Sequence, residues 1–200
     1  MQQPFLKGIH VYLRSLQISD LDGHYINWLN DAEVCQFNSH HVFPYTREAA
    51  TNYITQVNSS QAQIVLAVCL PSIKGEADQH IGNISLQRIN LIARQAEFAI
   101  LMGDKTQWGK GYAKEAAALI CQHGFKALNL NRIHCGTSED NRAMQKLAAY
   151  LGMSEEGRRR QAHYKNGQYV DIIEYGVLSN EFPHSPAAKA LYDRALVTSS

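Results

Sequence analysis

Hydrophobic residues recur along the chain with the two periods that distinguish strands from helices. Apolar runs and apolar–polar alternation predict seven strands, at 9–16, 63–70, 80–87, 94–102, 132–137, 158–164 and 168–178. Helical spacing predicts helices at 20–29, 46–57, 113–124 and 141–151, and a short one within 185–196. The predicted order up to 178 is therefore βααβββ, a loop, and then αβαββ.

Turn signals predict which of these strands are neighbours. Asn166 and Gly167 lie between the last two strands and accept the positive φ angles of a type I′ turn, so these strands should form a hairpin. A short polar bend separates 80–87 from 94–102 and predicts a second hairpin, whereas 72–79 has the composition of a turn.

The composition fits one folded domain. The chain has 200 residues, of which 45% are hydrophobic and 18% are charged, and this balance supports a well-buried core. We expect a single domain over 1–180, followed by a tail at 181–200 with one short helix. The 19 basic and 18 acidic residues give a formal charge of +1, which removes the electrostatic argument for a nucleic-acid partner.

The sequence carries no signal for a membrane, an export route or a metal site. No apolar run approaches the roughly 18 residues of a membrane span, and the start, MQQPFLKGIH, lacks a secretory pattern. We therefore expect a cytoplasmic protein that does not bind a membrane. The nine histidines form no HExxH motif and the cysteines form no CxxC pair, so we expect no metal and buried free thiols at Cys35, Cys69, Cys121 and Cys135.

A glycine-rich loop, QWGKGYAKEAA at 107–117, joins a predicted strand to a predicted helix. The amides of such a loop and the positive end of the helix bind a pyrophosphate. Lys110 lies between the glycines instead of after them, which excludes a Walker A loop. Lys114 replaces the third glycine of a dinucleotide fingerprint, and the loop is too far along the chain for one. A simple turn remains the alternative.

The loop resembles that of the GNAT superfamily of acyl-CoA-dependent N-acetyltransferases, whose motif is [Q/R]xxGx[G/A]. Gly111 and Ala113 match the motif, whereas Trp108 replaces its first residue. The resulting WGKGYA is similar to the form found in the RimJ/RimL-like subgroup. Four further segments over roughly residues 9–178 also resemble this subgroup: Trp28-Leu29-Asn30-Asp31 with Glu33-Val34, Ala96-Glu97, Gly103-Asp104-Lys105, and a helix that opens at Asn141 and ends in Leu151-Gly152-Met153.

This resemblance implies a fold and a co-substrate. The fold would be α/β (α+β), with a mixed, mostly antiparallel sheet of about seven strands flanked by helices. The two central parallel strands, at 94–102 and 132–137, would splay so that the pantetheine of acetyl-CoA enters between them. The implied cofactor-binding residues are Leu101, Met102, Trp108, Gly109, Lys110, Gly111, Tyr112, Ala113 and Asn141, with an amide of Leu101 or Met102 facing the thioester oxygen. Asn141 is also consistent with a helix cap alone.

Glu97 is the candidate general base, because an acid in an otherwise apolar strand must face either a cleft or solvent. An exposed strand glutamate is the alternative. Relatives carry a tyrosine or a serine as general acid at the positions of Ala148 and Met144, and Tyr150 should point elsewhere. We therefore assign no general acid.

These features predict an acetyl-CoA-dependent N-acetyltransferase that moves the acetyl group directly to a primary amine in a ternary complex. The acceptor would be a protein N-terminus, an amino sugar nucleotide or another small amine, and the protein a monomer or a homodimer. Two alternatives stay open: a non-catalytic acyl-CoA-binding module and a nucleotide-binding doubly wound enzyme. Acceptor specificity in such folds depends on the first helices and the last hairpin, here around Asp31, Glu33, Asn38, His40, His41, Tyr164 and Tyr169.

Overall fold

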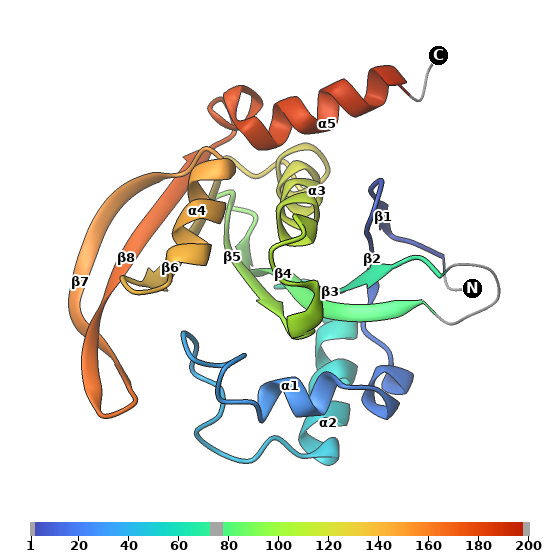
Figure 1. The fold of residues 1–200 in the computed structure, drawn as a ribbon. Coiled ribbons are helices and arrows are strands. Elements are labelled where there is room, and N and C mark those ends of the chain that lie inside the picture. Colours follow the sequence, from blue (N-terminus) through green and yellow to red (C-terminus); the bar gives the residue numbers. More distant parts are fainter. Residues whose placement is uncertain (1–2, 73–77, 198–200) are drawn as a thin grey trace.

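The computed structural model describes residues 3–72 and 78–197. Its strands form one eight-stranded sheet in the order β1-β2-β3-β4-β5-β6-β8-β7, in which only the β5–β6 pair is parallel (Figure 1). The strands are β1 (Leu6–Lys7), β2 (Tyr12–Ser15), β3 (Ile64–Leu70), β4 (Gln79–Asn90), β5 (Gln95–Met102), β6 (Arg132–Ser138), β7 (Ser154–Lys165) and β8 (Gln168–Leu178).

Helices cover both faces of this sheet. α1 and α2 pack on one face, and α3 and α4 pack on the other, so that two hydrophobic clusters form (Figure 1). α5 packs against α3. The helices are η1 (Ile18–Asp22), α1 (Tyr25–Leu29), α2 (Arg47–Ser59), η2 (Lys105–Gln107), α3 (Tyr112–Lys126), α4 (Arg142–Tyr150), η3 (Phe182–His184) and α5 (Pro186–Val197), where η denotes a 3-10 helix. The predicted mixed α/β class is confirmed.

The two central parallel strands separate as the resemblance implied. β5 and β6 pair only at Gln95–Arg132, Ala96–Ile133 and Glu97–His134, whereas β6 pairs with β8 along its whole length. Beyond these three pairs, β5 and β6 expose unpaired backbone groups to each other. Such groups are costly inside a protein unless a partner satisfies them, so the splay is a place for a ligand that adds hydrogen bonds.

Small side chains bring α3 close to the sheet. Ala116, Ala117 and Ala118 are at most 1% exposed. A Cβ on Gly124 would lie only 2.9 Å from the Cδ1 of Leu86 on β4, so a larger residue would push the helix away. The spacing of small residues therefore predicts this helix correctly and also its close approach.

The N-terminal strand predicted at 9–16 is β2, and the unpredicted β1 precedes it, so the sheet gains one strand over the seven expected. The turn between them is held from α3 by Glu115, whose carboxylate accepts the amides of Ile9 and His10. A Cβ on Gly8 would lie 2.2 Å from a Glu115 oxygen. Because this interaction joins residues about a hundred positions apart, no local pattern reveals it.

Four other predictions need correction or comment. The helix predicted at 20–29 is divided at Gly23 into η1 and α1. β7 starts at Ser154 instead of 158, and its first residues are exposed on both faces, so they show no alternation. The hairpin turn is confirmed, with φ of 53° at Asn166 and 80° at Gly167. The predicted turn at 72–79 falls largely on 73–77, which lie outside the described residues.

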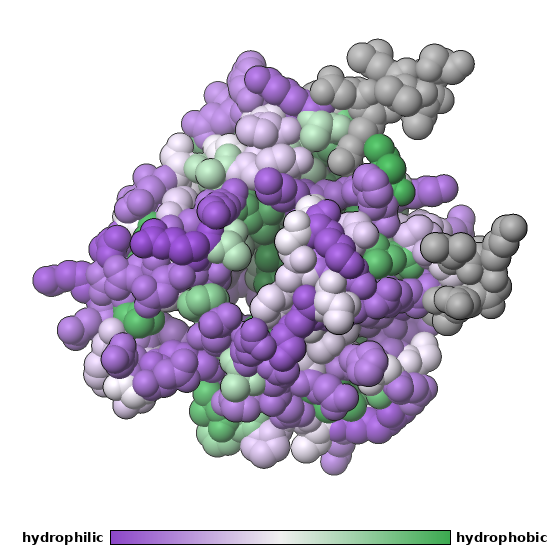
Figure 2. Space-filling model, viewed as in Figure 1, coloured by the Kyte–Doolittle hydropathy of each residue, from purple (hydrophilic) through white to green (hydrophobic). Residues whose placement is uncertain are grey.

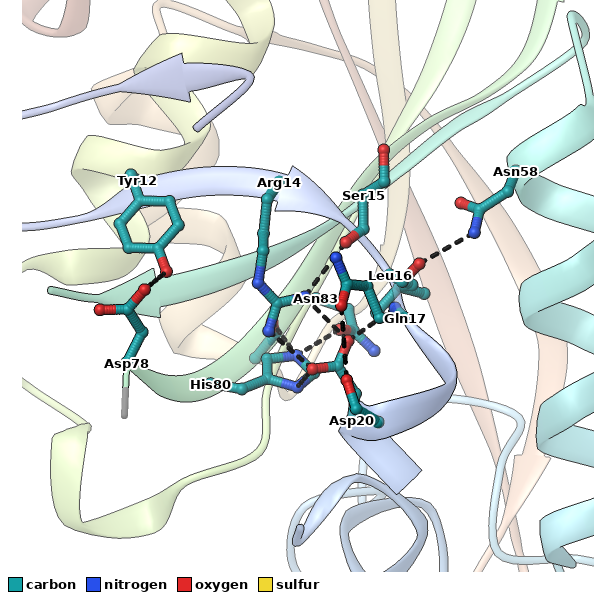
Figure 3. A network of polar contacts seen from close by, with 12 residues as sticks. Tyr12, Arg14, Ser15, Leu16, Gln17, Asp20, Asn58, Asp78, His80 and Asn83 are labelled. Atoms are coloured by element: carbon teal, nitrogen blue, oxygen red, sulfur yellow. Dashed lines mark hydrogen bonds and ion pairs between the residues drawn. The ribbon is translucent and has the colours of Figure 1, made fainter. Parts of the chain in front are cut away.

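A buried polar network fixes η1 and β4 against β2 (Figure 3). Arg14 donates to both oxygens of Asp20, at 2.9 and 2.6 Å, and both residues are 8% exposed. Burial alone would raise the pKa of Asp20, but the Arg14 hydrogen bonds, the nearby His80 and the amide of Gln17 together outweigh it, and the pKa is lowered. His80 lies beside Asp20, with its Nδ1 3.6 Å from a carboxylate oxygen, and burial lowers the pKa of its imidazole.

The same network supports the start of the loop that follows β5. The ring of His80 packs edge-on against Trp28 of α1, with 5.0 Å between centroids. Trp28 in turn covers Gly103, where a Cβ would lie 1.9 Å from the indole. Two of the short segments that carried the family resemblance, around 28–34 and 103–105, are therefore in direct contact.

Candidate active site

One cavity of about 600 Å³ occupies the splay and is lined by residues from both faces of the sheet. Figure 2 shows a hollow with hydrophobic residues at its bottom near the middle of this face, between α3 and α4 of Figure 1. After the roles that the sequence predicts for their residues, we call the part formed by α3, α4 and the glycine loop the cofactor end, and the part formed by Glu97 and the loop after α1 the acceptor end. The lining residues are Glu33, Val34, Gln36, Phe37, Asn38, Glu97 to Met102, Gln107 to Gly109, Gly111 to Lys114, Gly136, Thr137, Asn141, Ala143, Met144, Lys146 and Leu147.

The two glycines of the loop have the backbone that the sequence predicts. Gly109 and Gly111 have φ of 77° and 88°, in the left-handed region that favours glycine. A Cβ at either position would meet no atom within 4 Å, so the surroundings leave open space for a ligand. These two positions therefore require glycine because of their backbone conformation and because a ligand must approach it closely. Packing within the chain does not require glycine there.

Backbone amides gather at this loop without partners. The amides of Gly109, Lys110, Gly111, Tyr112 and Ala113 make no hydrogen bond to any residue in the described part of the chain. They precede or open the 15-residue helix α3, whose positive end adds to their field. This arrangement suits a phosphate or pyrophosphate.

Trp108 and Lys110 have roles that the motif alone does not reveal. The indole Nε1 of Trp108 donates to the carbonyl of Met102 at 2.8 Å and so ties the loop to the end of β5. Lys110 donates to Gln107 at 2.9 Å and is not among the residues that line the cavity. Lys110 was predicted to bind the cofactor, but its side chain is directed to Gln107 and the residue does not line the cavity.

The remaining predicted cofactor residues surround the splay. Leu101 and Met102 line the cavity at the end of β5. Asn141 also lines it and caps α4, because its side-chain oxygen accepts the amide of Met144 at 3.1 Å. The cap is therefore present, and it leaves the side-chain amide nitrogen of Asn141 available on the cavity side.

Sequence reasoning missed two lysines at the cofactor end. Lys114 on α3 and Lys146 on α4 both line the cavity. The Nζ of Lys114 lies 5.2 Å from the centre of the Tyr150 ring, and Lys146 forms no ion pair with a described residue. Neither lysine has an acid three or four positions away on its helix, a pattern that could have marked them as partners for an anion.

Glu97 lines the cavity, as the cleft-facing interpretation requires, and 29% of its side chain is exposed. One carboxylate oxygen pairs with Arg88 Nη1 at 3.1 Å, and the Arg88 side chain is 82% exposed. No described residue donates a hydrogen bond to the Glu97 carboxylate, which is therefore available for a proton transfer.

The positions where relatives carry a general acid are apolar here. Ala148 is fully buried, and Met144 lines the cavity without an acidic hydrogen. Tyr150 does not line the cavity, and its ring lies near Lys114 instead. The prediction that Tyr150 points elsewhere agrees with this placement.

At the acceptor end, acids and a lysine form a cluster. Lys105 Nζ lies 2.9 Å from both Asp31 Oδ2 and Glu33 Oε2, which joins η2 to the loop after α1. The hydrogen bond from Lys105 lowers the pKa of Asp31. Glu33 and Asn38 line the cavity, whereas the other predicted acceptor residues do not: these are Asp31, His40, His41, Tyr164 and Tyr169.

The hairpin tip and the loop after α1 nevertheless meet. Lys165 donates to the carbonyl of His40 at 2.6 Å. Tyr164 and Tyr169 stack beside each other at 4.8 Å between ring centres, and both are more than half exposed. The hairpin therefore supports the acceptor loop from outside the cavity.

No group of three or more His, Cys, Asp or Glu side chains among residues 3–72 and 78–197 is placed to hold a metal ion. The cysteines are all buried and free, and none lines the cavity. Burial raises the pKa of Cys135 to about 12. Within the same described part of the chain, no helix has the length and apolarity of a membrane span.

Comparison with known proteins gives a consistent result. An uncharacterized N-acetyltransferase, p20, from Bacillus licheniformis is 28% identical over 170 residues, which cover 85% of this chain and 93% of that protein. A spermidine N(1)-acetyltransferase from Escherichia coli K12 is 28% identical over 173 residues, or 86% and 88% of the two chains. The structure of a spermidine N-acetyltransferase from Vibrio cholerae, in complex with CoA and spermine, has a TM-score of 0.77 at 24% identity and covers 86% of this chain and 98% of that one.

The model of the acetyltransferase (GNAT) domain matches residues 10–154, which include the splay, the glycine loop and both walls of the cofactor end. This match spans well over half of the chain. The protein therefore belongs to the GNAT acetyltransferase family.

Proposed function

We propose that this acetyltransferase transfers the acetyl group of acetyl-CoA directly to the primary amine of a small acceptor while both substrates are bound. The observation that carries the proposal is the single cavity, which has unpaired amides at one end and a carboxylate at the other. Family membership supplies acetyl-CoA as the acyl donor.

The cofactor end fits acetyl-CoA. The five free amides from Gly109 to Ala113 would hold the pyrophosphate, and Lys114 and Lys146 would add positive charge beside it. The unpaired edges of β5 and β6 would bond the pantetheine, with an amide at Leu101 or Met102 directed to the thioester oxygen.

The acceptor end supplies a base. An amine arrives as an ammonium ion and must lose a proton before it attacks, and Glu97 is placed on the cavity to take it directly or through a water. The nitrogen then bonds to the thioester carbon, and the C–S bond breaks. The second proton passes from the nitrogen of the tetrahedral intermediate to the departing sulfur or to water.

Direct transfer is favoured over an acetyl-enzyme because the cavity offers no evident nucleophile. No cysteine lines it, and Cys135, the nearest to the splay in sequence, is 1% exposed with a raised pKa. A covalent intermediate would need a thiolate or an activated hydroxyl beside the thioester.

The acceptor class is the finer part of the proposal. Several relatives are named spermidine N-acetyltransferases, which favours a small cationic amine. The Lys105 contacts on Asp31 and Glu33, however, offset two acids that would otherwise attract additional positive charges of a polyamine. We also propose a place in the RimJ/RimL-like subgroup, supported by WGKGYA and by a putative ribosomal N-acetyltransferase from Bacillus subtilis that is 29% identical over 101 residues.

A thiol-release assay with acetyl-CoA and a panel of amines tests this function. The panel should contain spermidine, spermine, amino sugar nucleotides, aminoglycosides, amino acids and peptides with free N-termini. We expect thiol release with at least one small amine. Tight acetyl-CoA binding with no release from any amine would instead identify a non-catalytic acyl-CoA-binding module.

Thermal unfolding separates this function from nucleotide binding. Acetyl-CoA at about 100 times its Kd should stabilise the native state by about 2.7 kcal/mol, which raises Tm by roughly 5–10 °C in a domain of this size. ATP and NAD should give much smaller shifts. Equal shifts for all three ligands would show that the loop binds phosphates without preference for CoA.

A further inference from the structure

Thr137 presents a hydroxyl to the cavity. Its residue is 5% exposed and lines the cavity on β6. Its hydroxyl makes no hydrogen bond to any residue that the structure describes. This hydroxyl is not among the fully buried side-chain atoms that lack a partner, so it reaches the open surface of the cavity, where a ligand atom can become its partner.

The hydroxyls of two other buried residues differ from that of Thr137. Ser138, the next residue, is 3% exposed and accepts the amide of Asp140. Ser85 on β4 is 4% exposed and contacts both Gln87 and the carbonyl of Ala99. Thr137 is therefore distinguished by its missing partner and not simply by burial.

The position of Thr137 in β6 places it on the cofactor side of the splay. β6 leaves β5 after His134, so Thr137 lies in the segment with an unpaired edge toward β5. Ile133 and Cys135 belong to the cluster that α3 and α4 cover. Because side chains alternate along a strand, Thr137 points to the same face as these two residues.

This face is also the one where relatives place their general acid, on the helix corresponding to α4. Here Ala148 and Met144 occupy those positions, and neither can donate a hydrogen bond. Among the residues that line the cavity, only Tyr112 and Thr137 carry a hydroxyl. Tyr112 opens α3 at the glycine loop, next to the amides that suit a phosphate, and so lies at the wrong end for the thioester.

We propose that the Thr137 hydroxyl donates a hydrogen bond to the sulfur of CoA as the C–S bond breaks. This inference rests on the proposed function, because it needs acetyl-CoA in the splay. Thr137 would then stabilise the developing thiolate in the part of the active site where Ala148 and Met144 offer no donor.

The role is donation of a hydrogen bond and not loss of a proton. A threonine hydroxyl is a far weaker acid than a thiol, so it keeps its hydrogen while the electron pair of the broken C–S bond moves to sulfur. The proton that finally makes the CoA thiol comes from the nitrogen of the tetrahedral intermediate or from water. Atoms and charge balance without any further reactant.

Thr137→Val is a clean test because valine has nearly the same shape without the hydroxyl. The primary measurement is the ionisation of the thiol of bound CoA, followed by its ultraviolet absorbance across a pH titration. We expect the ionisation constant of that thiol to be about tenfold larger in the wild type than in the variant, since a charge-assisted hydrogen bond favours the thiolate.

Turnover should fall while stability stays nearly constant. Thr137→Val should lower kcat by roughly 10- to 100-fold with little change in the Kd of acetyl-CoA. Its Tm without ligand should change little, because the hydroxyl makes no hydrogen bond that the substitution could remove. Thr137→Ser, which restores the donor, should recover most of the activity.

Ser138→Ala is the matched control, since it removes a neighbouring buried hydroxyl that already has a partner. It should leave the ionisation of the bound thiol unchanged. Equal thiol ionisation in wild type and Thr137→Val would overturn the inference. So would a rise in the Kd of acetyl-CoA equal to the loss in kcat, because the hydroxyl would then bind the intact cofactor. The thiol titration needs no amine, so it remains decisive if no acceptor is acetylated and the proposed function fails.

Discussion

The cofactor end of the cavity is built mainly from backbone, whereas the acceptor end is built from side chains that hold one another in ion pairs. At the cofactor end, Gly109 and Gly111 adopt left-handed φ angles and Asn141 caps a helix. At the acceptor end, Lys105 bridges two acids and Arg88 pairs with Glu97.

This difference explains why the sequence predicts the residues of one end and not those of the other. A backbone site requires particular residue types at fixed spacing, such as glycine where φ is positive, so its sequence pattern is specific. A side-chain site can be assembled from many combinations of charged residues brought from distant segments. Asp31 and Lys105, for example, are 74 positions apart.

Substitution of Glu97, the proposed base at the acceptor end, should have the largest effect on turnover. Glu97→Gln keeps the shape and hydrogen bonding of the side chain but cannot accept a proton, so kcat should fall by roughly 10²–10⁴-fold with little change in acetyl-CoA affinity. The loss should shrink as the pH rises from about 6 to 9, because more of the amine is then already neutral.

Glu155→Gln, on the exposed strand β7, is the control and should behave as the wild type. If kcat/KM of Glu97→Gln and of the wild type run parallel with pH within a factor of about three, Glu97 is only a strand residue paired with Arg88, and water or another group removes the proton.

Asp20→Asn should destabilise the buried polar network that holds η1 and β4 against β2. It leaves Arg14 buried without its counter-ion, which should lower the free energy of unfolding by about 3–5 kcal/mol in a denaturant titration. Asp22→Asn breaks an exposed pair with Arg47 and should cost at most about 1 kcal/mol. Similar losses in the two variants would mean that the buried network of Figure 3 adds no special stability.

The Asp20 pair should also make stability depend on pH in the acid range. The pKa of Asp20 is lower in the folded state than the value of about 3.9 in an unfolded chain. Its contribution is therefore complete above about pH 5 and is lost as the pH falls through the folded pKa. Wild type and Asp20→Asn should converge in stability toward low pH.

Gly111→Val should damage the cofactor end selectively. A β-branched residue strains the left-handed backbone at φ 88° and places its side chain where the pyrophosphate must approach, so acetyl-CoA affinity should fall at least about tenfold. The fold should survive, because a Cβ there meets no atom within 4 Å. Gly157→Val, at an exposed strand glycine with equally open surroundings, should bind normally; normal binding by Gly111→Val would show that the loop does not hold the cofactor.

The smallest expected effect concerns acceptor charge. Lys105→Met frees Asp31 and Glu33, so the KM of a polyamine should fall about two- to fivefold, while the KM of a singly charged amine changes less. Lys189→Met removes a positive charge from α5 instead and should change neither value. An unchanged KM for both classes of amine would show that these acids do not contribute to the acceptor field.

The sequence predicted most of the fold because hydrophobic periodicity and turn-forming residues are local features of the chain. The glycine loop, the Asn141 cap, the Asn166-Gly167 hairpin and the small-residue face of α3 all follow from short patterns. The extra strand was missed because its turn depends on Glu115 of α3, and the start of β7 was missed because an edge strand exposed on both faces shows no alternation.

The sequence also predicted only part of the candidate site. Nearly all of the predicted cofactor residues line one cavity, and Glu97 does too. Val34, Gln36, Phe37 and Thr137 were not predicted, because their place on the cavity depends on where β5 and β6 separate and on how the loop after α1 returns. Such placement is a property of the assembled sheet and has no counterpart in a short motif.

The most direct test of the single cavity is the initial-rate pattern when acetyl-CoA and the accepted amine are varied together. Direct transfer requires both substrates to be bound at once, so double-reciprocal plots at several fixed amine concentrations should intersect. Parallel lines, together with acetyl transfer to the protein in the absence of amine, would show a covalent acetyl-enzyme and would contradict direct transfer between the two ends of the cavity.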